Sequence, residues 1–207
     1  MVFHSAEIRL LLDAAAYMLL FVMLGLTFAR RPFAFVDHLG SLASGTALPL
    51  AVIFTRSGYG NALTILAIAG AILSVAMGTH LVVPALLIAV QLLGQLCSNV
   101  MKRLIARLRP EVWHFRHELG FAYPSGHAVT AIVFYLGWAA IASQWNVPPS
   151  VHALLFGVAA IWALGIGWSR LALGAHRLTD ILGGYSLGLA WLAVFLALRA
   201  ALHAAAT

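Results

Sequence analysis

Charged side chains are scarce in this 207-residue sequence: 9% of the residues are Asp, Glu, Lys or Arg, whereas 63% are hydrophobic. An average soluble domain has roughly 25% charged residues, so the composition argues against a soluble globular protein. No such charge occurs between Arg56 and Lys102, or between Glu118 and Arg170. Because a transmembrane helix needs about 20 mostly apolar residues, each uncharged stretch can hold two membrane crossings.

Cysteine is almost absent as well. The single Cys97 excludes an intramolecular disulfide and says nothing about the redox compartment, and we expect it to be a packing residue in an apolar span. The N-terminal apolar segment lacks a basic leading region and a small-residue cleavage site, and it ends in Arg30-Arg31. We therefore interpret it as a retained helix rather than a cleaved signal peptide.

The apolar stretches predict an all-α integral membrane protein with six transmembrane helices. The first uncharged stretch breaks near Gly78 and Pro84, and the second breaks at Pro148-Pro149, because prolines end a helix and favour a turn. No internal repeat or linker divides the chain, so residues 1–207 are predicted to form a single domain. The predicted spans cover approximately residues 10–29, 61–77, 82–101, 127–143, 151–168 and 179–198.

The stretch from Pro32 to Thr55 is harder to assign. It is apolar enough to suggest a seventh span, yet it contains Asp37, His38, Pro49 and several glycines. We interpret it as an interfacial or re-entrant segment. A seventh span would move the N-terminus to the other side of the membrane.

Helices that alternate in direction would bring the chain near residues 30–60, 102–125 and 169–180 to one membrane face. Five basic residues lie between Lys102 and Arg116 in the second of these regions. Alone, they could be interfacial cations whose side chains extend toward water. Polar groups at a membrane boundary are costly unless they are used, so their convergence with two other polar segments predicts an active site at that face.

The fourth predicted span begins with Pro124-Ser125-Gly126-His127. A proline and two small residues before an apolar run predict a helix start, where free backbone N–H groups and the positive end of the helix dipole suit a phosphate. Alone, this segment is weak support, because Pro-Ser-Gly is also common in turns and a lone histidine is more often structural.

The third polar segment joins the fifth and sixth spans and contains His176 and Asp180. Their spacing of four would place both side chains on one face of a helix. The carboxylate could then hold one imidazole nitrogen and leave the other free to attack. Taken singly, such a pair is more often a structural hydrogen bond.

Together these residues resemble the type 2 phosphatidic acid phosphatase (PAP2) superfamily, in particular its bacterial membrane lipid phosphatases. The signatures of that family read K-x6-R-P, P-S-G-H and S-R-x5-H-x3-D, and the resemblance covers about residues 60–200. It implies a six-helix membrane enzyme that needs no metal or other cofactor and reacts through a phosphohistidine. The matching residues are Lys102 with Arg109-Pro110, then Pro124-Ser125-Gly126-His127, then Ser169-Arg170 with His176 and Asp180.

The resemblance also implies a role for each catalytic residue. His176 would attack phosphorus, while Asp180 fixes the imidazole tautomer and stabilises the developing cation. His127 would protonate the departing lipid oxygen and then act as a base toward water.

Phosphate binding would fall to the remaining motif residues. Positive charge must surround the transferred phosphoryl group, and arginine can hold two of its oxygens at once. The backbone amide of a helix start can add a neutral donor. The implied phosphate-binding residues are Lys102, Arg109, Ser125, Gly126 and Arg170.

Other polar and aromatic residues lie beside the motifs without matching a fixed position. They could hold a second phosphate, although anchoring to lipid headgroups is the simpler interpretation. We expect the aromatic residues Trp113, Phe115 and Phe121 to seat the loop at the membrane interface. The neighbouring polar residues are Arg103, Arg107, Arg116, Arg177, His114 and His117.

The resemblance leaves the substrate open among undecaprenyl diphosphate, phosphatidylglycerol phosphate and phosphatidic acid. A lipid A phosphatase or phosphotransferase is the nearest alternative. A vanadate-dependent haloperoxidase shares the site but is soluble, and a flippase or inactive lipid-binding protein would release no phosphate. The net charge of +6 could indicate nucleic acid, but the basic residues gather at span ends, which favours anionic lipid.

Sidedness is predicted from two opposing arguments. A simple count of positive charges in the loops would place the site in the cytoplasm. Several of those cations are explained by catalysis or headgroup binding, and resemblance to bacterial members favours the periplasmic or outer leaflet of the inner membrane. We therefore expect a multi-pass inner-membrane protein with its site on the periplasmic side.

Overall fold

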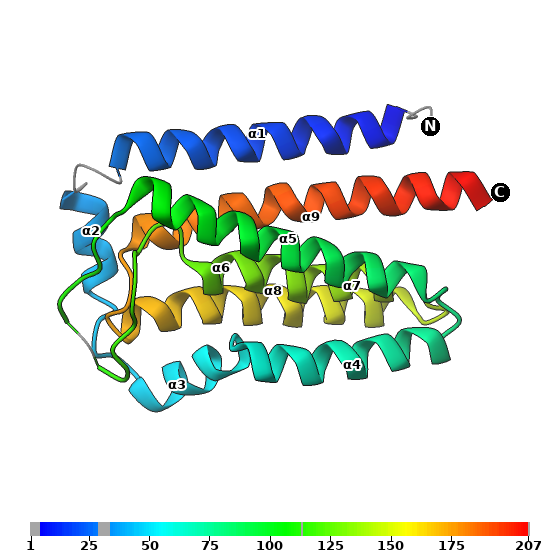
Figure 1. The fold of residues 1–207 in the computed structure, drawn as a ribbon. Helices are drawn as coiled ribbons and strands as arrows, with labels where there is room; N and C mark the ends of the chain where they lie inside the picture. The colour runs from blue at the N-terminus through cyan, green and yellow to red at the C-terminus, as the bar shows by residue number, and fades with distance from the viewer. Residues whose placement is uncertain (1–4, 29–33, 113, 207) are drawn as a thin grey trace.

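The computed structural model describes residues 5–28, 34–112 and 114–206, and over these residues it is a helical bundle without β-strands. Both chain ends lie at one end of the bundle, and the loops that join α5 to α6 and α8 to α9 lie at the other (Figure 1). The predicted all-α architecture is confirmed. Trp113 and Arg30-Arg31 lie outside the described residues.

Four helices are long and apolar enough to cross a membrane. Each begins or ends within a few residues of the predicted boundaries, because the apolar runs are interrupted there by glycine, proline or charge. They match the predicted spans at 10–29, 82–101, 151–168 and 179–198. These helices are α1 (Ser5–Phe28), α5 (Val82–Ile105), α8 (Pro149–Ala172) and α9 (Leu178–Ala206).

The predicted span at 61–77 corresponds to α4 (Gly60–Ala76), which is short for a crossing by itself. It follows α3 (Leu48–Ser57) at a bend of 58°, and the two helices together are apolar enough for a fifth crossing. With α2 (Ala34–Ser41), α3 accounts for most of the uncertain segment at 32–55. That segment is therefore not one continuous helix, and its last third, residues 48–55, belongs to α3 of the broken α3–α4 pair.

The remaining predicted span, at 127–143, is an apolar helix over Gly126–Ala142. It consists of α6 (Gly126–Ala131), a π-helical turn η1 (Ile132–Leu136) and α7 (Gly137–Ala142). At 17 residues it is shorter than a standard crossing. Among the described residues, length and composition thus support four or five crossings, and six spans stay a prediction.

The segment Gly126–Ala142 lies in the core of the bundle because it is apolar on all sides. A helix that is apolar all round is buried, and Ala128, Val129 and Val133 are at most 1% exposed. By contrast, outer helices turn large apolar side chains outward: Leu26 is 76% exposed and Ile65 is 68% exposed. Exposed apolar surface on this scale indicates a lipid-facing exterior. Cys97 packs against a buried cluster around Phe21 and Tyr123, as predicted for a packing residue.

Candidate active site

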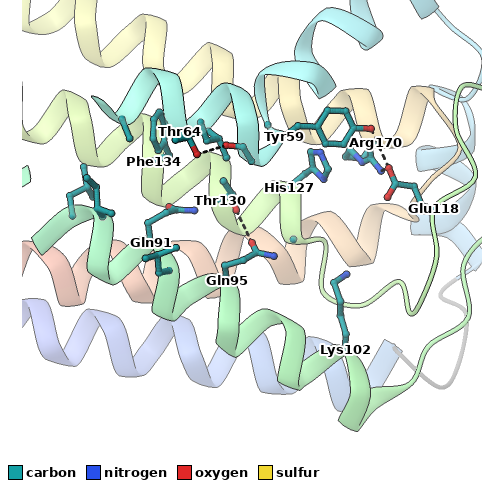
Figure 2. Close-up of a pocket in the computed structure, with 18 of the residues that line it drawn as sticks. Tyr59, Thr64, Gln91, Gln95, Lys102, Glu118, His127, Thr130, Phe134 and Arg170 are labelled. Atoms are coloured by element: carbon teal, nitrogen blue, oxygen red, sulfur yellow. Dashed lines mark hydrogen bonds and ion pairs between the residues drawn. The ribbon is translucent and has the colours of Figure 1, made fainter. Parts of the chain in front are cut away.

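One cavity of about 460 Å³ brings together six of the eight predicted site residues from three distant segments of the chain. Figure 2 shows Lys102, His127 and Arg170 among the residues that line it. It lies beside the bend between α3 and α4 and extends along α5. The other two predicted residues, Asp180 and Ser125, are fully buried and do not line it. The six lining residues are Lys102, Arg109, Gly126, His127, Arg170 and His176.

The His176–Asp180 pair forms across a helix start rather than along a helix. Because α9 begins at Leu178, His176 precedes it, and the expectation of one helical face for both residues is wrong. Nδ1 of His176 nevertheless lies 3.5 Å from Oδ2 of Asp180. That oxygen also accepts the backbone N–H of Arg177 at 2.8 Å. A carboxylate in the first turn satisfies an otherwise unpaired N–H and faces the positive end of the dipole.

Arg107 holds the other oxygen of Asp180. Its Nη1 donates to Asp180 Oδ1 at 2.7 Å and to Thr179 Oγ1 at 2.6 Å, and its Nη2 lies 3.6 Å from Asp37 Oδ2. Arg107 is 7% exposed and does not line the cavity. The interpretation of Arg107 as a residue for a second phosphate or a headgroup is therefore wrong, because its guanidinium is used inside the protein.

The second nitrogen of His176 faces the cavity. Its Nε2 lies 3.1 Å from Arg109 Nη1, and Arg109 is itself fixed by the carbonyls of Ala175 and Gly120 at 3.0 and 3.1 Å. Burial lowers the pKa of His176 to about 3, although Asp180 acts in the opposite direction. The imidazole is thus neutral near pH 7. With its proton on Nδ1 toward Asp180, Nε2 carries the lone pair, which faces the cavity and accepts from Arg109 Nη1.

Arg170 is 1% exposed and lies between a hydroxyl and a carboxylate. Nη1 donates to Thr55 Oγ1 at 2.5 Å and Nη2 donates to Glu118 Oε1 at 2.8 Å. Burial raises the pKa of Glu118, but the ion pair with Arg170 outweighs it and holds that pKa below its ordinary value. Sequence reasoning missed Glu118, which belongs to no motif. It places a negative charge beside a predicted phosphate-binding residue.

The break between α3 and α4 holds His127 in place. The Tyr59 ring meets the imidazole edge-on, with centroids 5.1 Å apart, and a Cβ on Gly58 would lie 2.7 Å from His127 Cδ2. Nε2 of His127 is buried and has no hydrogen-bond partner among the described residues. An atom of a molecule in the cavity can therefore bond to it. No sequence motif pointed to Gly58 or Tyr59.

Lys102 links the end of α5 to the loop before α6. Its Nζ donates to the carbonyls of Pro124 at 2.6 Å and Phe121 at 3.2 Å, which leaves one of its three donors. The predicted helix start is confirmed, since α6 begins at Gly126. The N–H of Ser125 donates to the Asp180 carbonyl at 3.0 Å, so the second motif is bonded directly to the third.

Three of the remaining neighbouring polar residues make contacts within the protein. Arg177 donates to the Leu108 carbonyl at 3.0 Å, His114 lies 2.9 Å from the Ser44 hydroxyl, and Arg116 lies over the Tyr59 ring. None of Arg103, Arg116, Arg177, His114 and His117 lines the main cavity. Arg116 instead lines a separate pocket beside Tyr59, together with Arg56 and Phe115, and a second phosphate-binding set stays a prediction.

Comparison with known proteins identifies the family. The model of the PAP2 superfamily matches residues 83–203, which include all three motifs. The chain is 38% identical to phosphatidylglycerophosphatase B of Bacillus subtilis (strain 168) over 96 residues, which make up 46% of this chain and 47% of that protein. The match thus spans about half the length of that relative.

A longer match is to the lipid A 1-phosphatase of Rhizobium johnstonii, with 28% identity covering 82% of this chain and 70% of that protein. Among solved structures, the transmembrane PAP2-type phosphatidylglycerolphosphate phosphatase of Bacillus subtilis superimposes with a TM-score of 0.82. That superposition has 24% identity and covers 91% of this chain and 96% of that one, which shows a shared fold. The multi-pass helical fold, the convergence of the three motifs and the family match agree: this chain belongs to the PAP2 superfamily.

Proposed function

We propose that the protein is a membrane phosphatase that hydrolyses a lipid phosphate or diphosphate through a phosphohistidine. One observation carries this proposal: two histidines and three cations from distant segments line a single cavity that continues between apolar helices. The cations suit a phosphate, and the apolar continuation suits the rest of a lipid. Relatives named as phosphatases support the same reaction class.

The proposed reaction has two steps. Nε2 of His176 attacks phosphorus, the bond from phosphorus to the lipid oxygen breaks, and His127 gives that oxygen a proton. Water then attacks the phosphohistidine, His127 takes the proton from water, and inorganic phosphate leaves as His176 is restored. Lys102, Arg109 and Arg170 would neutralise charge on the phosphoryl oxygens, and Asp180 would stabilise the imidazolium that forms.

Glu118 has a defined place in this scheme. Its carboxylate is bonded to Arg170 in the cavity, and a phosphate that used Arg170 would compete with it for the same donors. Substrate binding would therefore displace Glu118 toward the loop from which it comes. The Tyr59 hydroxyl lies 3.4 Å from Glu118 Oε1, so displacement of Glu118 would also break this contact.

The proposed substrates are phosphatidylglycerol phosphate, phosphatidic acid and undecaprenyl diphosphate, with lipid A phosphate as the alternative that the Rhizobium relative favours. We propose an inner-membrane location with the site at the outer leaflet. Both chain ends lie at the opposite end of the bundle from the site loops (Figure 1).

Phosphate release from these four lipids in detergent micelles tests the function. We expect release from at least one of them, and we expect it to persist in EDTA because side-chain cations supply the required charge. Product analysis by mass spectrometry would separate hydrolysis from transfer to an acceptor lipid. Absence of phosphate release from all four lipids, or strict dependence on an added metal, would contradict the proposal.

Replacing Gly58 with alanine should slow catalysis by roughly 10- to 100-fold, because a displacement of the acid by about an ångström has effects of this size. The added Cβ would lie 2.7 Å from the His127 ring, so the imidazole must shift. The loss should appear in kcat, with the unfolding temperature nearly unchanged. Gly157→Ala is the matched control, since no atom lies within 4 Å of a Cβ at that site. Equal kcat values for the two variants would refute this positioning role.

A further inference from the structure

A second pocket, of about 490 Å³, lies beside the bend between α3 and α4, where the loop that joins α5 to α6 reaches α3 (Figure 1). We call it the arginine pocket. The proposed catalytic steps use none of its side chains, although Tyr59 lines the main cavity as well. The arginine pocket is lined by Arg56, Tyr59, Asn61, Ala62, Phe115 and Arg116.

Aromatic rings hold both arginines in a crossed arrangement. The Arg56 guanidinium lies 5.9 Å from the centroid of the Phe115 ring, and the Arg116 guanidinium lies 5.7 Å from the centroid of the Tyr59 ring. A cation over a ring face within about 6 Å of its centroid is attracted to the ring. Stacking of this kind leaves the N–H groups at the edge of each guanidinium available to an acceptor. The pocket therefore presents two fixed cations with unused donors.

Neither arginine has an anionic partner in the described part of the chain. Glu118 lies two residues after Arg116, but it bonds to Arg170 at 2.8 Å and lines the main cavity. No acidic side chain among the described residues lines the arginine pocket. Two like charges in one concave site produce a positive potential that favours a bound anion.

The start of α4 adds further donors to the same pocket. The first N–H groups of a helix have no partner within it, and the positive end of the helix dipole suits a phosphate. Asn61 and Ala62 lie in this first turn and line the pocket. Asn61 Oδ1 accepts the N–H of Ala62 at 2.9 Å, which leaves the NH₂ group of Asn61 as a donor. The set of donors thus fits an oxyanion.

An apolar stripe on α4 continues from the arginine pocket toward the other end of the bundle. Ile65, Ile68 and Ile72 follow Asn61 at spacings of four, three and four, so all four residues share one face of the helix. The three isoleucines are 57–68% exposed, and the helical rise makes the stripe about 16 Å long. An anionic group in the pocket could therefore carry acyl chains along this face, which favours a lipid over free phosphate.

We propose that the arginine pocket binds the headgroup of an anionic phospholipid other than the lipid in the main cavity. The phosphodiester would lie between the two guanidiniums, and the acyl chains would lie on the outer face of α4. A zwitterionic lipid would bring its own cation toward the arginines and bind more weakly. Figure 2 shows Tyr59 beside His127 and Glu118, and its ring meets the His127 imidazole edge-on. The bound lipid would therefore lie one aromatic ring away from the main cavity.

Native mass spectrometry of the detergent-solubilised protein can test this proposal without turnover, so the result does not depend on the phosphatase reaction. The protein is titrated with dioleoyl phosphatidylglycerol or with dioleoyl phosphatidylcholine, which have the same acyl chains. We expect about 10- to 30-fold tighter binding of phosphatidylglycerol, since each basic residue at an anionic membrane surface contributes about fivefold. Excess inorganic phosphate should not displace it. Equal affinity for the two lipids, or displacement by inorganic phosphate, would overturn the proposal.

Arg56→Gln and Arg116→Gln each remove one charge at an exposed position, and each should weaken phosphatidylglycerol binding about fivefold. Phosphatidylcholine binding should stay within about twofold of wild type. Arg103→Gln is the matched control, because Arg103 is also exposed but lies outside the pocket, and it should bind as the wild type does. An equal loss in the Arg103 variant would show general surface attraction and refute a built site. Loss in Arg109→Gln with full binding in both pocket variants would place the lipid in the main cavity and refute it as well.

Discussion

His176→Ala is expected to reduce phosphate release by at least about 10⁴-fold, because loss of a nucleophile that acts together with its partners removes nearly all of their combined effect. The alanine leaves no nitrogen at this position to attack phosphorus. The variant should remain folded, since Asp180 keeps its bonds to Arg107 and to the Arg177 backbone. Single-turnover assays with the preferred lipid measure the loss.

His152→Ala is a suitable control for this prediction, because that histidine bonds to the Trp145 carbonyl at the far end of the bundle. Its activity should match the wild type. A trapping experiment adds a direct readout: acid-labile phosphate should label wild-type protein exposed to radiolabelled substrate, and His176→Ala should remain unlabelled. Turnover near the wild-type value in His176→Ala would eliminate it as the nucleophile.

The sequence predicted the fold well where one apolar run makes one helix. The four long helices cover their predicted spans, because the limits of these runs are largely local features, although α1 begins five residues before the predicted limit and α9 ends eight residues after it. The broken α3–α4 pair could not be predicted as one unit. At its bend, Gly58 packs against His127, which is distant in sequence, and no local pattern records such a contact.

The candidate site shows the same division. The short motif spacings identified His127, Arg170 and His176 as candidates, and all three line one cavity. Glu118 escaped notice because a carboxylate in a polar loop has no distinctive spacing. Its contact with Arg170 depends on how the loop packs against α8.

Even within the recognised motifs, position along the chain did not predict the local geometry. His176 and Asp180 were expected on one helix, but the chain turns between them and α9 begins at Leu178. The contact survives because the carboxylate is held at the helix start by an N–H and by Arg107. Spacing of four thus predicted the pairing of these two residues for an incorrect structural reason.

Arg107 provides the second large effect, on stability as well as on activity. Arg107→Met should destabilise the fold by about 3–5 kcal/mol, the usual result of removing one partner of a buried ion pair. Asp180 is fully buried and would lose a partner at 2.7 Å. The unfolding temperature in detergent should fall markedly. Arg103→Met, four residues earlier and exposed, should leave it nearly unchanged.

The role of Arg107 in positioning Asp180 can be separated from its role in stability with Arg107→Lys. Lysine keeps the positive charge but cannot hold Asp180 and Thr179 with one planar group, so the fold should be largely retained. If Arg107 orients the carboxylate behind the nucleophile, Arg107→Lys should lower kcat by roughly 10-fold with little change in KM, because substrate contacts are untouched. If Arg107 served stability alone, the folded Arg107→Lys protein would have the wild-type kcat. An Arg107→Met protein as stable as the wild type would show that the buried ion pair does not hold this site together.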